Sequence, residues 1–104
     1  MRHRGKRRDA NHFELMNHAK SIGFLVLDTS QLNAGLDLIV GLHSFMRRIE
    51  IKDGSKPPSE RKLLASEQKA FDEWPGLCVV WESEADVDLL HTQLTDEWRR
   101  LLPF

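Results

Sequence analysis

The sequence has one cysteine and no long apolar run, and each shortage excludes a class of protein. Cys78 alone cannot build an internal disulfide framework, and such cysteine usage suits a reducing cytosol. No apolar segment approaches the ~20 residues of a membrane-spanning helix. The basic start, MRHRGKRR, lacks the apolar region of a signal peptide. We therefore predict a cytoplasmic protein with no membrane partner.

Glycine-rich phosphate loops, Cys/His zinc spacings and internal repeats are also missing from the sequence. Their absence favours a protein without a nucleotide cofactor or a structural zinc. The chain has 104 residues, of which 40% are hydrophobic, so it is long enough for one core. We expect a flexible basic arm over residues 1–8 and a single domain over residues 9–104.

The net charge of −1 hides a segregation of charge along the chain. Residues 1–8 carry five Lys/Arg and no acid, and residues 47–69 carry seven Lys/Arg against four acids. Residues 70–98 carry eight acids and no Lys/Arg. A basic face with an acidic back would allow local phosphate contacts, with Arg7 and Arg8 of the arm touching DNA. The alternative is that these runs are only solvated surface and a disordered tail.

Hydrophobic periodicity and turn residues predict seven elements in the order α-β-β-β-α-β-α. The expected helices cover residues 9–21, 60–73 and 84 onward, and the expected strands cover 24–29, 36–40, 45–52 and 77–81. This order is typical of an α/β (α+β) fold with a mixed sheet and helices on both faces. The nearly continuous apolar run at 36–40 indicates a strand buried on both faces.

The stretch from Leu36 to Lys52 contains the chemistry. Asp37 interrupts an apolar run, where a carboxylate is costly unless a cation or hydrogen bonds compensate it. Glu50 and Lys52 flank Ile51, and a period of two places both on one face, roughly 7 Å apart. Ile51 then faces the core.

Asp37 and Glu50 offer hard oxygen ligands of the kind that Mg²⁺ or Mn²⁺ binds, and the Ile51 carbonyl offers another. Lys52 can orient or deprotonate an attacking water, or neutralise charge at phosphorus. Arg48 shares the face of Glu50 and would contact DNA. The alternative is a surface strand with alternating charges.

The pattern D-x12-E-x-K from Asp37 to Lys52 resembles the PD-(D/E)XK nuclease superfamily. The following run, EIKDGSKPPSERKL, then Gln68-x-x-Phe71 and Trp74-Pro75-Gly76, is similar to the small VRR-NUC domains found alone in phages and prophages. The resemblance covers about residues 9–88, although Leu36 stands where the family has proline before the first acid. It implies a restriction-endonuclease-like αβββαβ core, here with a C-terminal helix, and a metal-dependent endodeoxyribonuclease.

The resemblance also implies roles for two helical residues. Glu14 matches the acid that the first helix gives to the metal site, so the expected ligands are Glu14, Asp37, Glu50 and Ile51. Gln68 matches a glutamine that supports the lysine or a water, which completes a catalytic set with Asp37, Glu50 and Lys52. The alternative is that Glu14 and Gln68 are exposed helix residues.

The loop at 53–59 follows the catalytic strand directly, and its Gly, Pro and Ser content marks it as a loop. Lys56 and nearby backbone amides could hold a phosphate of the strand being cut. Gly35, in the turn before Asp37, permits close backbone approach near a metal or phosphate.

The resemblance further implies a homodimer acting on branched or double-stranded DNA, in the manner of a four-way junction resolvase. A phage-encoded copy would act in the host cytoplasm. Two rival functions stay open: a catalytically silent DNA-binding or interaction module of the same fold, and a nicking subunit of a larger phage enzyme.

Overall fold

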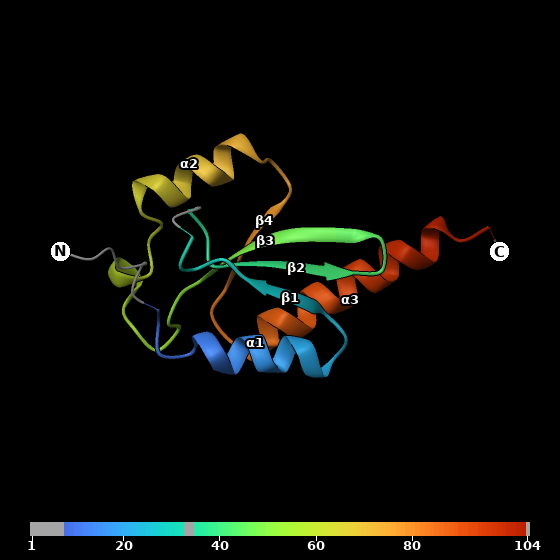
Figure 1. Ribbon diagram of the computed structural model, residues 1–104, viewed down its shortest axis with the longest axis horizontal. Helices are drawn as coiled ribbons and strands as arrows, with labels where there is room; N and C mark the ends of the chain where they lie inside the picture. The colour runs from blue at the N-terminus through green and yellow to red at the C-terminus, as the bar shows by residue number, and fades with distance from the viewer. Residues whose placement is uncertain (1–7, 33–34, 104) are drawn as a thin grey trace.

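The computed structural model describes residues 8–32 and 35–103, so Arg7 lies outside the described residues. Its elements are α1 His12–Ser21, β1 Leu25–Asp28, β2 Leu38–Leu42, β3 Phe45–Ile51, α2 Ala65–Glu73, β4 Cys78–Trp81 and α3 Glu84–Leu101, with a short 3-10 turn at Pro58–Glu60 (Figure 1). The predicted order of helices and strands is confirmed, and the fold is mixed α+β. None of the helices in the described chain is long and apolar enough to cross a membrane.

The four strands form one mixed sheet in the order β1-β2-β3-β4. β1 with β2 and β2 with β3 are antiparallel, whereas β3 with β4 is parallel. A parallel pair needs a crossover connection, and α2 lies in the connection between β3 and β4. The topology therefore brings the end of β3 close to the segment that leads into α2.

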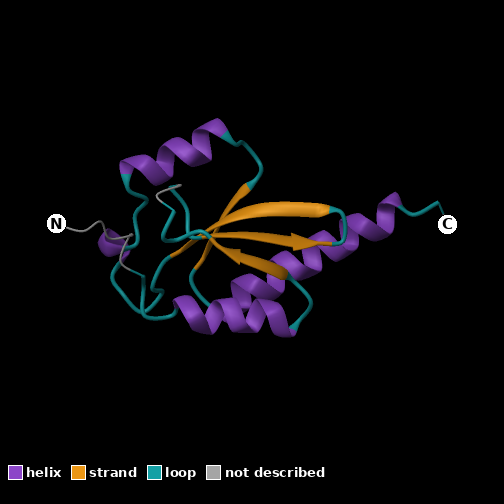
Figure 2. Ribbon diagram, in the orientation of Figure 1, coloured by secondary structure: helices purple, strands orange, loops and turns teal. Residues whose placement is uncertain are grey.

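One face of the sheet carries the hydrophobic core, covered by α1 and α3 (Figure 2). The alternation along β3 sends Ile49 and Ile51 into this core, as the period of two predicts, and both are fully buried. Trp81 of β4 is also fully buried, where its ring meets Phe24 edge-on at 5.8 Å. Burial of this face is the main source of stability.

The opposite face is covered by α2 at one end only (Figure 1). Leu25, Leu27 and Met46 point to that face and are exposed. Ile39 lies between Leu27 and Arg48 in the register and is half-buried. The predicted burial on both faces is therefore confirmed at residues 36–38, which expose 3% or less of their surfaces, whereas Ile39 is only half-buried because no helix of the described chain extends over it.

Three predicted boundaries also shift. β2 begins at Leu38 and continues to Leu42, so Asp37 immediately precedes the strand and the turn is His43–Ser44. The predicted helix from Glu60 begins only at Ala65, after the 3-10 turn that Pro57-Pro58 introduces. The first helix begins after Asn11 rather than after Asp9.

Candidate active site

Asp37, Glu50 and Lys52 lie together at the end of the sheet where β3 finishes. The antiparallel register pairs Leu38 with Ile49, so its continuation places Asp37 opposite Glu50. The three residues expose only 3%, 1% and 8% of their surfaces. Burying three ionisable side chains is costly unless they are paired or hydrogen-bonded. We call these three residues, with Glu67, the charged row.

Asp37 is fixed by the backbone of the neighbouring strand. Its Oδ2 accepts a hydrogen bond of 2.8 Å from the Ile51 amide, and its own amide donates to the Ile49 carbonyl at 2.9 Å. On its other side, its carbonyl accepts from the Thr29 amide at 2.8 Å. The carboxylate is thus held in one orientation by the peptide group between Glu50 and Ile51.

Lys52 lies between two carboxylates. Its Nζ is 2.8 Å from Glu67 Oε1 and 3.5 Å from Glu50 Oε2. Burial disfavours the ammonium, but the hydrogen bond to Glu67 and the charge of Glu50 outweigh burial and raise the pKa of Lys52. A lysine with a raised pKa is charged at neutral pH, so Lys52 is a cation held between two carboxylates.

Glu67 is the residue of the row that the sequence places beside the site but to which it assigns no role. It is buried at the start of α2, where its Oε1 also accepts from the Leu64 amide at 2.8 Å and satisfies a free end of the helix. This contact ties the start of α2 to Lys52. The available signal was the need of a buried lysine for a counter-charge, together with an acid in the first turn of the helix.

Gln68 is not part of the row. It is exposed, and its Nε2 donates to Asp72 Oδ1 at 2.9 Å on the outer side of α2. Glu67 and Ala70 are the buried residues of this helix, so the neighbouring Gln68 is turned away from the sheet. The contact with Lys52 that was expected of Gln68 is made by Glu67 instead.

Glu14 is not brought to Asp37 and Glu50 either. α1 packs on the core face of the sheet, whereas Glu50 belongs to the opposite face. Glu14 is exposed and shares a hydrogen bond with Glu84 at the start of α3, which raises the pKa of Glu14. It lines a polar cleft together with Asp53. The expected metal role of Glu14 therefore finds no support in its position.

Asp9 and Asn11, which precede α1, lie closer to the charged row than Glu14 does. Asp9 is near enough to Lys52 and Asp37 for their charges to act on it, although burial is the main cause of its raised pKa. Asn11 Nδ2 donates to the Lys52 carbonyl and the Glu82 carbonyl, both at 3.1 Å. These contacts join the start of α1 to the ends of β3 and β4.

Lys56 lies on the loop that follows Lys52, where it was expected. It is exposed and lines a cleft of about 360 Å³ with Asp9 and Asp53. Asp53 Oδ1 accepts from both the amide and the hydroxyl of Ser55, at 3.0 and 2.7 Å, which shapes the loop. The cleft leaves Lys56 accessible to a phosphate.

Arg8 is engaged within the chain. Its Nη2 is 3.4 Å from Asp28 Oδ2, and its guanidinium lies 5.0 Å from the ring centroid of Phe13. Asp28 also accepts from Ser30, whose hydroxyl is at 2.7 Å, and faces the buried His12 at 3.3 Å. An expected DNA contact by Arg8 would compete with this pairing.

Arg48 shares the face of Glu50, as the period of two predicts. Its guanidinium carbon lies 5.3 Å from the ring centroid of Trp74 at the end of α2. This geometry is a cation–π contact. Arg48 and Trp74 therefore form a basic and aromatic surface next to the charged row.

The ability of the row to hold a divalent cation depends on the carboxylates of Asp37 and Glu50, which lie opposite each other on neighbouring strands. Among the described residues, no group of three or more His, Cys, Asp or Glu side chains is arranged to hold a metal ion. Mg²⁺ commonly takes one or two carboxylates from a protein and completes its shell with water and phosphate. Asp37 and Glu50 match that smaller set. The Ile51 carbonyl stays a predicted ligand.

A scan against protein-family models, a search of curated proteins and a search of solved structures each found no match. The resemblance to PD-(D/E)XK nucleases therefore stays a prediction from the motif, and any function has to be argued from the site.

Proposed function

We propose that the protein is a Mg²⁺- or Mn²⁺-dependent endodeoxyribonuclease with a PD-(D/E)XK-type site. One observation carries the proposal. Lys52 is held 2.8 Å from Glu67 and 3.5 Å from Glu50, in a row more than nine-tenths buried that also contains Asp37. A similar volume of apolar side chains would often be at least as stable as such a buried ionic group. Clusters of this kind beside a cleft are candidates for chemistry.

Asp37 and Glu50 would hold the cation, which when bound supplies Lewis acidity at the scissile phosphate. The hydrogen bond from the Ile51 amide orients Asp37. Charged Lys52 stabilises negative charge that develops at phosphorus, and Glu67 fixes the position of the ammonium.

DNA is the proposed substrate because two cations lie on the segments that lead to and from the row. Lys56 lines a cleft with Asp53, the residue after Lys52, and Arg48 lies two residues from Glu50 on the same face. Backbone phosphates attract such cations regardless of sequence. A homodimer would present two sites to two strands, which suits branched DNA, as the motif resemblance implies.

Cleavage assays test the proposal directly. Wild-type protein is incubated with linear, flapped and four-way DNA in Mg²⁺, Mn²⁺, Ca²⁺ or EDTA. We expect cleavage in Mg²⁺ or Mn²⁺ and none in Ca²⁺ or EDTA. Cleavage that persists undiminished in EDTA would refute the metal requirement. Failure to cut any of these substrates with either metal would favour the silent module.

A further inference from the structure

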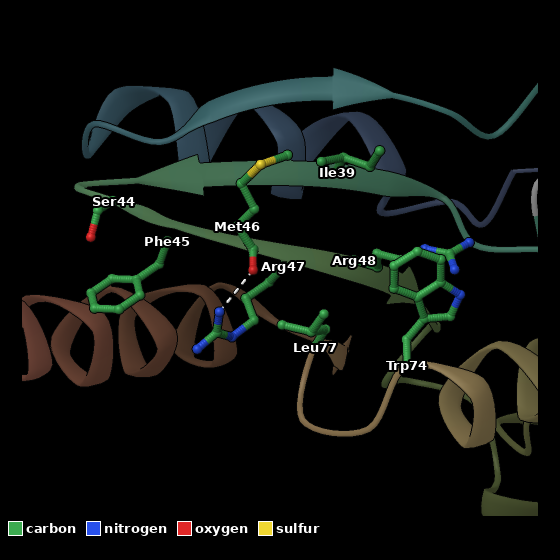
Figure 3. A pocket seen from close by; sticks show the side chains of 8 residues that line it. All are labelled: Ile39, Ser44, Phe45, Met46, Arg47, Arg48, Trp74 and Leu77. Atoms are coloured by element: carbon green, nitrogen blue, oxygen red, sulfur yellow. Dashed lines mark hydrogen bonds between the residues drawn. The ribbon is translucent and has the colours of Figure 1, made fainter.

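An apolar groove with two arginines opens beside the first residues of β3. β4 pairs only with Arg48–Ile51, so within the described part of the chain Phe45–Arg47 form a free edge of the sheet. The groove has a volume of about 720 Å³, within the range of roughly 300–1,000 Å³ for ligand pockets. It is lined by Ile39, Ser44, Phe45, Met46, Arg47, Arg48, Trp74 and Leu77 (Figure 3).

The groove combines aromatic rings with cations. Figure 3 shows Trp74 beside Arg48 at one end of the groove and Phe45 at the other. The guanidinium of Arg48 lies 5.3 Å from the Trp74 ring centroid, and that of Arg47 lies 5.8 Å from the Phe45 ring centroid. Trp74 still exposes 48% of its surface. A flat aromatic ligand can therefore stack on an indole already held by an arginine.

The charge of the groove favours an anionic ligand. Among the described residues, its lining includes two arginines and no acid. A two-fold symmetric contact between two copies pairs the same patch with itself. Pairing this groove with itself would bring four guanidinium groups together without a carboxylate among the lining residues. A second copy is therefore a poorer match than a ligand that carries both an aromatic ring and a phosphate.

We propose that this groove binds an unpaired nucleotide of the DNA strand next to the phosphate that is cut. The inference rests on the proposed function, because it places the nucleotide relative to the charged row. Arg48 and Glu50 are two residues apart on one face of β3, a separation of roughly 7 Å. A base stacked on Trp74 would thus lie beside the row, and the enzyme would prefer DNA with an unpaired base near the cut, as in branches and flaps.

Binding without divalent metal tests the groove separately from cleavage. The complete wild-type chain is titrated in EDTA against a labelled 15-nucleotide dT strand and a 15-base-pair duplex, with fluorescence anisotropy as the readout. We expect Trp74→Ala to weaken binding of the dT strand about tenfold and binding of the duplex less than twofold. Trp74→Phe should recover most of the loss. Leu25→Ala, a change at an exposed apolar residue on the same sheet face, should alter neither affinity.

Tryptophan fluorescence gives a second readout that does not depend on a truncated side chain. Trp81 is fully buried, and Trp98 is stacked on His43 with ring centroids 5.5 Å apart. In Trp98→Phe, Trp74 is the exposed indole that a stacked base can quench. We expect the dT strand to quench this variant strongly, and free dTMP to do so only at much higher concentration. Absence of quenching by the dT strand would overturn the proposal.

Other outcomes separate the alternatives. Equal losses on dT and duplex in Trp74→Ala would show a phosphate-contacting surface without a base site. A dimer that dissociates in Trp74→Ala by sedimentation, with unchanged dT affinity, would assign the face to a second copy. Trp74-dependent dT binding by a protein that cuts no DNA would support the groove and refute the nuclease. Normal cleavage by a protein whose dT binding does not depend on Trp74 would support the nuclease and refute the groove.

Discussion

The two ends of the sheet face opposite the core differ in their side chains, and both depart from the usual distribution of charged and apolar residues. At one end, Asp37, Glu50 and Lys52 are charged and buried beneath the start of α2. At the other end, Leu25 and Met46 are apolar and expose 79% and 63% of their surfaces. The usual arrangement is the opposite, with charges outside and large apolar side chains inside.

The difference supports the proposal that this face contacts something beyond the chain. Buried charges cost stability through desolvation, and exposed apolar side chains forgo the gain of burial. On the core face, beneath α1 and α3, the apolar side chains are packed against one another. Local departures from consistent folding rules are expected at functional sites. The charged row lies on this face, and the groove opens beside it along the free edge of β3, with Ile39, Met46 and Arg48 contributed by the same face.

Removing the cation from the row should give the largest effect on stability. Lys52→Ala leaves Glu50 and Glu67 buried without the ammonium between them. We expect the free energy of unfolding to fall by about 3–5 kcal/mol, measured by urea titration. Lys62→Ala, at an exposed lysine, should stay within about 0.5 kcal/mol of wild type. A loss below about 1 kcal/mol for Lys52→Ala would mean that water solvates the row.

Asp28, at the end of β1, should behave as a structural acid in contrast to the acids of the row. Burial acts to raise its pKa, but hydrogen bonds from Ser30 and the nearby His12 outweigh burial and lower the pKa to about 2. Its stabilisation is complete above its unfolded pKa, near 4, and is lost as pH falls through about 2. The stability difference between wild type and Asp28→Asn should therefore shrink by roughly 2 kcal/mol between pH 5 and pH 2.

Urea titrations of both proteins across this pH range measure the difference. An unchanged gap between wild type and Asp28→Asn at pH 2 would show that Asp28 has an ordinary pKa in the folded protein.

Glu67 and Gln68 are neighbours in the sequence, but Glu67 is buried in the charged row and Gln68 is exposed. Substitutions at the two positions therefore compare a residue of the row with a residue outside it. Glu67→Gln weakens the attachment of Lys52, so we expect single-turnover cleavage to fall about tenfold, or roughly 1.4 kcal/mol. Gln68→Ala changes an exposed residue and should stay within about twofold. Thermal unfolding of both variants serves as the control for folding. The opposite ranking of the two rates would restore the role that the motif predicts for Gln68.

The smallest effect is expected on the open end of the face. Leu25→Ala removes an apolar side chain that is already in water, so its free energy of unfolding should change by less than about 0.5 kcal/mol. Leu38→Ala, at a fully buried leucine of the core, should cost about 2–5 kcal/mol. Urea titration of the two variants compares the faces. A similar cost for both would show that Leu25 is covered in solution.

Local periodicity was sufficient to predict the strands and most of the row. On a strand, the face of each residue follows from parity alone, so Ile49 and Ile51 could be assigned to the core, and Glu50 and Lys52 to the other face. The order of elements followed from turn residues and apolar spacing. These features depend on neighbours in the chain, which the sequence displays directly.

The helical parts of the site could not be predicted in this way. Adjacent helical residues differ by about 100° in direction, so the choice between Glu67 and Gln68 depends on how α2 packs on the sheet. The start of α2 at Ala65 could not be predicted, because Leu64 precedes the helix in place of a usual capping residue. The uncovered sheet face was hidden as well, since Leu25 and Leu27 resemble core residues in the sequence.

Glu50→Gln tests the central claim, that the row is catalytic rather than structural. The change preserves size and polarity but removes a charge proposed to bind metal. Single-turnover cleavage of four-way DNA in Mg²⁺ and the melting temperature are measured together for wild type and variant. We expect cleavage to fall by about 10²–10³, or about 3–4 kcal/mol, while the melting temperature holds or rises because fewer acids crowd the row. Undiminished cleavage by Glu50→Gln, or a lower melting temperature with no wild-type cleavage to lose, would contradict the account.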